Sequence, residues 1–232
     1  MSFDTIAAAV ATLLSATLAT MILARGWGTR RAHLLAWGTS LGLFAVGSAT
    51  LTFGSATSWT PALFRLYYAA GAVLTVPFLG LGSLWLHSPR AGRVAGLVVA
   101  IFVVVAVVVV VTAPLRGPVA PDVVPEGKEL FGAWPRTLAV MGNVVGTILV
   151  VGGTVRSILR VASRRHRGIE ADRRMLQANL LITLGVVVAA SGGAFLGFGE
   201  AASKAIPLAL AASLIFLGYM RSQPARPAQM AP

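Results

Sequence analysis

The chain has 232 residues, of which 56% are hydrophobic and only 11% are charged. Soluble domains carry about 25% charged residues, so this composition excludes a water-soluble globule, a disordered chain and a coiled coil. The 25 glycines and 12 prolines follow no regular period, which excludes a fibrous protein. Because the chain has no cysteine, disulfides, thiolate metal sites and covalently attached haem are excluded as well.

Seven apolar stretches are long enough to cross a bilayer as helices. A hydrocarbon core of about 30 Å needs roughly 20 apolar residues in helical form, and continuous apolar runs without strict alternation favour helices over a barrel. We therefore expect a single all-α domain over residues 1–232, a polytopic bundle of seven transmembrane helices. The predicted spans are 6–24, 34–53, 62–86, 94–113, 137–155, 178–198 and 201–220.

The basic residues divide unevenly between the two ends of these spans. Fourteen arginines lie at one set of ends, against five lysines and arginines at the other. The positive-inside rule therefore predicts an N-terminus outside and a C-terminus in the cytoplasm. Trp27, Trp37 and Trp85 lie near the predicted inner edges, and Trp59 and Trp134 near the outer ones, as in an interfacial aromatic belt. The first span has its arginines after the apolar run, unlike a secretory signal, so we expect it in the mature protein.

The net charge of +12 would suggest nucleic-acid binding in a soluble protein. Here the basic residues flank the spans, so we interpret them as topology signals that attract the anionic lipid headgroups of the bilayer, and we expect no nucleic acid as a partner. A basic cluster between the fifth and sixth spans is the candidate for contact with anionic lipid or with an acidic partner. Its members are Arg160, Arg164, Arg165, Arg167, Arg173 and Arg174.

The titratable residues give little support to catalysis. No acidic residue lies near the middle of a predicted span, which argues against the simplest proton- or sodium-coupled transport, although carbonyls of a broken helix can still hold sodium. His33 and His87 share the inner boundary without a third ligand nearby, so we predict no metal site. Lys204 is too close to the start of the last span for a retinal Schiff base. Hydrolase, protease, P-loop and dinucleotide motifs are missing, and we expect no cofactor and no enzyme activity.

One polar constellation gathers near the outer end of the predicted bundle. Arg65, Tyr67 and Tyr68 begin the third span, Asn143 lies about two turns into the fifth, and Glu200 follows the sixth. An arginine close to hydrocarbon needs a partner, and we expect Arg65 to pair with Glu200. We expect the amide of Asn143 to form an interhelical hydrogen bond. These five residues form a candidate ligand-binding pocket; alternatively, the ion pair only ties helices together.

Pro77 lies near the middle of the third span and predicts a local break. Proline removes a backbone donor and frees the carbonyl of Val73, so a kink is expected there. Gly71, Gly80 and Gly82 would let other helices approach the bend. The functional interpretation is a hinge or cavity wall beneath the outer pocket, and the alternative is a packing kink.

Two further segments carry weaker signals. The outer loop, 114–136, is rich in proline and ends in a short amphipathic piece, 129–134, that is suited to lie on the bundle as a lid. Residues 40–54 and 183–197 share a few identical positions, which would allow an internal duplication of three helices. Shared glycine and alanine content explains this similarity more simply.

Three strings resemble those of uncharacterised seven-span membrane proteins of high-GC Gram-positive bacteria: RLYYAAGAVLTVPFLGLGSLWL, PEGKELFGAWPR and ANLLITLGVVVAASGGAFLGFGE. The resemblance covers most of the chain. It implies a location in the bacterial plasma membrane and carries no activity with it.

Two classes of function remain after these exclusions. The first is a non-enzymatic protein that binds or transports a solute or lipid through an outer-facing polar pocket. The alternative is an accessory or scaffold subunit that packs against a membrane protein partner or a second copy of the chain. A continuous polar cavity would favour the first class, and a dry bundle with an exposed small-residue face would favour the second.

Overall fold

A computed structural model describes residues 3–163 and 205–222 of the chain, together with a few positions between them. Within this part the chain is helical, and its only β-structure is an isolated antiparallel bridge between Leu115 and Phe131. The further described positions are Gln177, Leu180, Leu181, Leu184, Gly185, Val187 and Val188.

The described helices fall into long continuous elements and one interrupted span. The third span consists of α3 (Pro61–Tyr67), a π-helix η1 (Tyr68–Leu74) and α4 (Thr75–His87), which follow one another without a gap. A single short turn, α6 (Gly127–Leu130), interrupts the outer loop. The long helices are α1 (Phe3–Thr29), α2 (Ala32–Ala56), α5 (Pro89–Thr112), α7 (Ala133–Ser163) and α9 (Ala205–Ser222).

Five of these helical stretches are long and apolar enough to cross a membrane, which confirms the first five predicted spans. Each stretch runs a few residues past at least one predicted end, because the helices continue through polar residues at the predicted interfaces. Predicted span 178–198 lies mostly outside the described residues, and 201–220 corresponds to α9, so the count of seven stays a prediction. The five stretches are Thr5–Thr29, Ala32–Ala56, Pro61–His87, Pro89–Thr112 and Ala133–Arg156.

Ser/Thr-Pro pairs begin two of the helices. The side chain of Thr60 accepts a hydrogen bond from the backbone N–H of Leu63 (3.2 Å), and Pro61 follows as the first helical residue. Ser88 caps α5 in the same way, ahead of Pro89. A hydroxyl at the cap satisfies a free N–H of the first turn, and proline there loses no hydrogen bond. These pairs therefore fix where α3 and α5 start.

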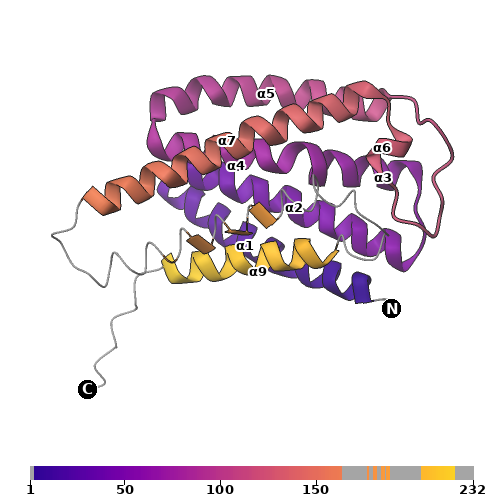
Figure 1. The fold of residues 1–232 in the computed structure, drawn as a ribbon, viewed down its shortest axis with the longest axis horizontal. Coiled ribbons are helices and arrows are strands. Elements are labelled where there is room, and N and C mark those ends of the chain that lie inside the picture. The colour runs from indigo at the N-terminus through magenta and orange to yellow at the C-terminus, as the bar shows by residue number, and fades with distance from the viewer. Residues whose placement is uncertain are drawn as a thin grey trace, which may run out of the picture.

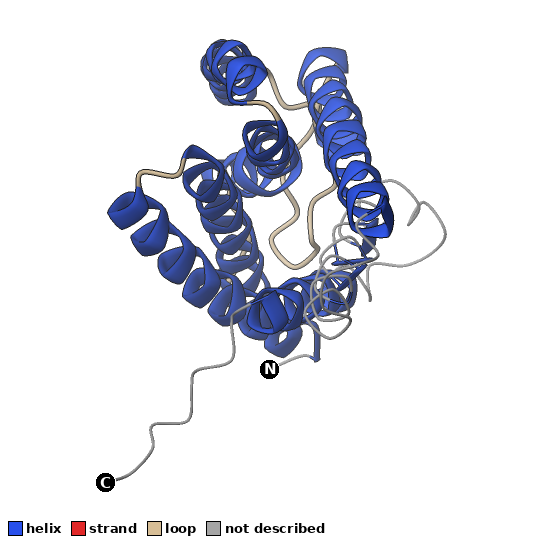
Figure 2. Cartoon of the chain, turned by 90° about the vertical axis from the view of Figure 1, so that its left-hand side faces the viewer, coloured by secondary structure: helices blue, strands red, loops and turns tan. Residues whose placement is uncertain are grey.

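The third span is central to the packing of the described helices (Figure 1). It contacts α2, α5 and α7, while α1 lies beyond α2 and packs against α9. Seen end-on, the described helices form an open arc (Figure 2). Successive long helices run antiparallel, so α4 and α7, the last part of the third span and the fifth span, run parallel to each other.

Glycines set the closest approaches between helices. A Cβ built on Gly47 of α2 would lie 2.9 Å from the Cα of Gly71, and one built on Gly80 would lie 2.8 Å from the Cα of Gly146 on α7. Small residues of this kind let membrane helices pack backbone to backbone. The third span is thus gripped on two sides, and the predicted roles of Gly71 and Gly80 as contact points are confirmed.

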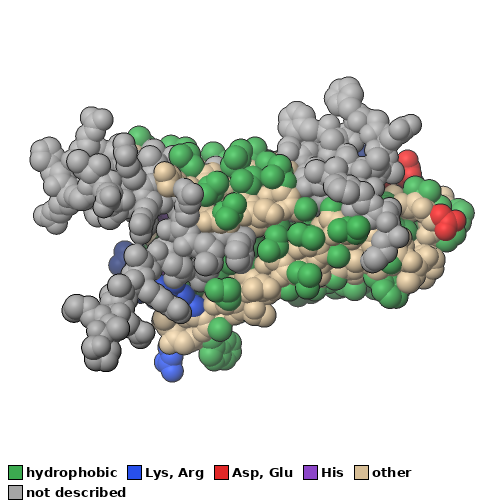
Figure 3. All heavy atoms as spheres, turned by 90° about the horizontal axis from the view of Figure 1, so that it is seen from below, with side chains coloured by type: hydrophobic (Ala, Val, Ile, Leu, Met, Phe, Trp, Pro, Cys, Tyr) green, Lys and Arg blue, Asp and Glu red, His purple; other side chains and the backbone are tan. Residues whose placement is uncertain are grey.

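Charge separates along the length of the bundle. In Figure 3 hydrophobic side chains cover much of the visible middle, with lysine or arginine near one end and aspartate or glutamate at the other. The turn from α1 to α2 lies at the basic end, where Arg30 adopts a left-handed φ of 53° and the N–H of Arg31 returns to the carbonyl of Gly26 (3.1 Å). The outer loop lies at the opposite end.

Candidate functional site

Arg65 is held inside the outer end of the protein by backbone carbonyls. Its guanidinium donates hydrogen bonds to the carbonyl of Val110 and, at 2.8 Å, to that of Ala113, where α5 ends. The last carbonyls of a helix have no intrahelical donor, and the helix dipole favours a cation beside them. The guanidinium carbon also lies 5.8 Å from the ring centroid of Phe131, close enough for a cation–π contact.

Phe131 of the outer loop is fully buried among aromatic rings. Its ring stacks on Phe64 at 4.9 Å between centroids and lies 4.8 Å from the ring of Tyr68. Leu130 beside it is also buried, whereas Trp134 is exposed. The predicted lid segment therefore lies on the bundle with one apolar side turned inward.

Backbone and ring contacts anchor the rest of the outer loop. The N–H of Trp59 donates to the carbonyl of Pro121 (3.0 Å), and the N–H of Arg116 donates to that of Leu130 (2.9 Å). Trp59 is itself buried, with its ring edge-on to that of Tyr67 at 5.5 Å. We refer to these five rings as the aromatic cap: Trp59, Phe64, Tyr67, Tyr68 and Phe131.

The charged residues of the loop lie at its surface. Lys128 pairs with Glu126 at 2.8 Å, and this hydrogen bond, together with the negative charge of Glu126, raises the pKa of Lys128. An ion pair this exposed adds little to stability. Gly127 between them lies directly over the ring of Tyr68, where a Cβ would come within 2.2 Å of a ring carbon. The loop thus presents charge outward and a close backbone contact inward.

Asn143 lies beside the π-helix and forms the expected interhelical hydrogen bond. Its Nδ2 donates to the carbonyl of Ala72 at 2.9 Å, while its Oδ1 is buried and without a partner. Arg65, by contrast, bonds to α5. The two predicted pocket residues are thus bonded to different elements, and each donor group is already engaged by backbone.

The π-helix η1 is a feature that the sequence analysis missed. Glycine and proline in the third span predicted a kink, but not an i→i+5 register from Tyr68 to Leu74. Thr75 is the available signal, because its Oγ1 donates to the carbonyl of Ala70 five residues earlier (2.8 Å). Such π segments occur as single turns within α-helices, frequently at functional sites. The hinge prediction for Pro77 itself stays a prediction.

Two residues of α2 bond to the inner half of the third span and were also missed. Ser40 Oγ donates to the carbonyl of Thr75 (2.7 Å), and Trp37 Nε1 donates to that of Leu79 (3.2 Å). Trp37 was predicted only as an interfacial residue. Ser48 of α2 is buried, and its Oγ has no hydrogen-bond partner. The α2–α4 contact is therefore polar at several points.

Several predicted site residues lie outside the described residues. Glu200 is one of them, so its pairing with Arg65 stays a prediction. Within the basic cluster, the side chain of Arg160 and all of the later residues fall outside the description in the same way. The remaining members are Arg164, Arg165, Arg167, Arg173 and Arg174.

The described residues offer no cluster of metal ligands. In that part of the chain there is no group of three or more histidine, cysteine, aspartate or glutamate side chains. His87 Nδ1 lies 2.8 Å from the carbonyl oxygen of Ser83, and the ring of His33 lies edge-on to Trp37 at 5.5 Å. Each imidazole is thus engaged locally.

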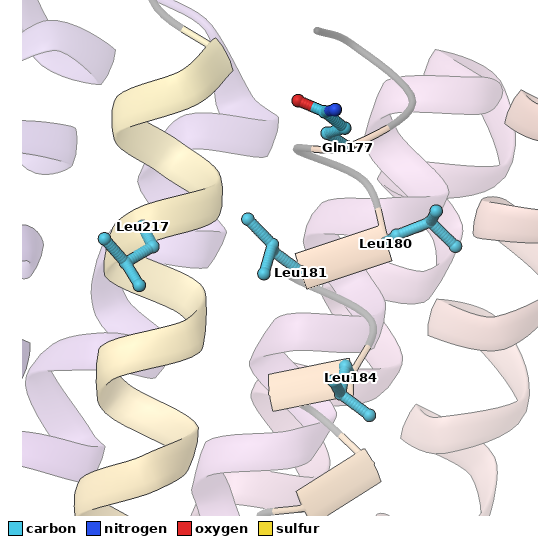
Figure 4. A pocket seen from close by; sticks show the side chains of 5 residues that line it. All are labelled: Gln177, Leu180, Leu181, Leu184 and Leu217. Carbon is cyan, nitrogen blue, oxygen red and sulfur yellow. The ribbon is translucent and has the colours of Figure 1, made fainter. Parts of the chain in front are cut away.

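A separate apolar pocket lies beside α9, with a volume of about 360 Å³ (Figure 4). It is lined by leucines and a single amide, and none of the predicted site residues contributes to it. The volume lies in the range of small-molecule sites. The lining residues are Gln177, Leu180, Leu181, Leu184 and Leu217.

The fold and this site define a helical protein of the membrane-spanning class, by the length and composition of its helices. Comparison of the chain with models of protein families, with curated proteins and with solved structures found no match.

Proposed function

We propose that the protein is a non-enzymatic accessory or scaffold subunit of the bacterial cytoplasmic membrane, with its N-terminus outside and its C-terminus in the cytoplasm. The separation of basic and acidic residues between the two ends of the bundle supports this orientation. The apolar spans support the membrane location. The proposed role is to bind another helix through one face of α7.

The observation that carries the proposal is an exposed stripe along α7. Its members follow one another at alternating intervals of four and three residues, the spacing of left-handed helix pairs. Nothing lies within 4 Å of a Cβ built on Gly152, so a partner helix has room to approach there. We refer to this set as the α7 stripe: Met141, Val145, Ile148, Gly152, Val155 and Leu159.

The outer polar pocket is less well supported as a functional site. Arg65 and Asn143 would be its main hydrogen-bond donors, and both are engaged by backbone carbonyls. Phe131 is buried against Tyr68, another predicted member of the pocket. A role in lipid binding is the second candidate function, favoured by the leucine-lined pocket beside α9.

Photo-crosslinking from the α7 stripe tests the proposal in native membranes. A photoreactive residue at Ile148, which is 64% exposed, is expected to form a discrete protein adduct. The matched control is Val104 of α5, which is 63% exposed on a valine-rich helix and is expected to label lipid alone. Gly152→Phe should abolish the protein adduct, because the new ring fills the approach to the stripe. Lipid adducts alone at Ile148 would contradict the accessory role and favour the lipid-binding one.

A further inference from the structure

Pro77 leaves one carbonyl of the third span without its helical donor, and the register decides which carbonyl this is. Proline has no backbone N–H. In an i→i+4 register the carbonyl opposite position 77 belongs to Val73. In an i→i+5 register it belongs to Ala72. The same missing donor is therefore felt at two different places in the α and π forms.

The side chains around η1 bond to the carbonyls that match the π form. Asn143 Nδ2 donates to the carbonyl of Ala72 at 2.9 Å. Thr75 Oγ1 donates to the carbonyl of Ala70 at 2.8 Å, across the same interval of five residues. Residues 68–74 are in the π form in this structure. The carbonyl that this register deprives of a donor is thus supplied with one from α7.

The placement of Asn143 has a cost that makes its hydrogen bond informative. Its Oδ1 is buried and has no partner, and an unpaired buried polar atom is unfavourable. An apolar residue at this position would avoid that cost but would leave the Ala72 carbonyl unpaired in the π form. The amide donor is therefore what favours the π form over the α form.

The two halves of the third span are held by different parts of the protein. Above η1, the ring of Tyr68 is packed against Phe131 of the outer loop. Below it, Ser40 and Trp37 of α2 bond to the carbonyls of Thr75 and Leu79. A change of register by one residue rotates one half against the other by about 100°. Movement of the outer loop is thereby coupled to the helix that continues to the inner end.

We propose that the third span is a register switch, in which Asn143 selects the π form while the aromatic cap is closed. Release of Phe131 from the cap frees α3 to rotate, and residues 68–74 then return to the α form. In that form the orphan carbonyl is Val73, to which Asn143 does not donate. The switch transmits an event at the outer loop to α4 and its contacts with α2 and α7.

Distance measurement between two spin labels tests the switch. The chain has no cysteine, so Leu66→Cys and Leu86→Cys label only the intended sites. Both positions are 49% exposed, and they flank η1 about 30 Å apart along the helix. The labelled parent is expected to show one main distance. Asn143→Leu and Phe131→Ala are each expected to raise a second distance, with the ratio of the two forms changing about tenfold for the loss of one net hydrogen bond in Asn143→Leu.

A control and a coupled variant make the result specific. Thr112→Val removes a hydroxyl bond of 2.8 Å within α5 and should leave the distances of the parent unchanged. Pro77→Ala restores the missing N–H, so it should itself favour the α form, and Asn143→Leu should then have no further effect. One unchanged distance in folded Asn143→Leu and Phe131→Ala would overturn the proposal. So would simple additivity of Pro77→Ala and Asn143→Leu, which also decides the matter if one single variant folds poorly.

Discussion

The guanidinium of Arg65 satisfies carbonyls that α5 cannot satisfy by itself. The hydrogen bonds to Val110 and Ala113 come from two different nitrogens of one planar group. A guanidinium presents several donors in a fixed geometry, whereas a lysine ammonium is a single point charge. Arg65 therefore links α3 to the end of α5 in a way that few other side chains would reproduce.

Arg65→Ala is expected to destabilise the protein by about 1–3 kcal/mol, because it leaves two partly buried carbonyls without donors. Arg65→Lys should recover only part of this loss. The measurement is thermal unfolding of the purified protein in detergent. Arg93→Ala removes an exposed charge at the opposite end and should leave the melting temperature nearly unchanged. Equal effects of Arg65→Ala and Arg93→Ala would contradict the structural role of Arg65.

The same residue allows a test of the predicted pairing with Glu200. If the pair exists, truncating either charge leaves the other unpaired. Glu200→Gln should then cost less in the Arg65→Ala background than in the parent. Equal costs in the two backgrounds would mean that the carbonyls of α5 are the partners that matter.

At the scale of elements, the contact between α4 and α7 depends on paired glycines. Gly80→Ala would place a Cβ 2.8 Å from the Cα of Gly146, so the helices must separate. Overpacking of this kind typically costs about 1–3 kcal/mol. We expect Gly80→Ala to lower the melting temperature in detergent.

Gly42→Ala is the matched control for this contact. It also lies within a helix, but a Cβ there meets nothing within 4 Å. Alanine has the higher helix propensity, so Gly42→Ala should be neutral or slightly stabilising. Equal losses of stability at both glycines would show that helix propensity, rather than the α4–α7 contact, controls the response.

The helices also differ in how much of each is buried. Only 11% of the α5 span lies inside the protein, against 56% of α2. The α5 span has a mean hydropathy of 3.5 and suits an acyl environment along most of its surface. The α7 stripe is the more specific surface, because its spacing and its open glycine fit a second helix.

At the scale of the whole molecule, the distribution of arginine predicts which end of the bundle faces the cytoplasm. With fourteen basic residues on one side, a tag placed after Pro232 should resist external protease in intact cells and become cleavable after lysis. A tag inserted in the outer loop, near Gly117, should show the reverse. Cleavage of the C-terminal tag without lysis would overturn the proposed orientation.

The sequence by itself determined which segments are membrane helices and roughly where they end. Hydrophobic length and the placement of arginine and proline are local properties, and they located the first five spans to within a few residues. The expected hydrogen bond of Asn143 followed from a local rule as well, since a membrane amide seeks a partner on another helix.

Only the tertiary structure decided what the polar residues bond to. Arg65 meets the end of α5, and Asn143 meets a carbonyl of η1, because packing brings together positions that are 45 and 71 residues apart in the chain. The π register is non-local for the same reason. Glycine and proline mark a weak point in the third span, but the choice between two registers depends on donors that neighbouring helices present at that height.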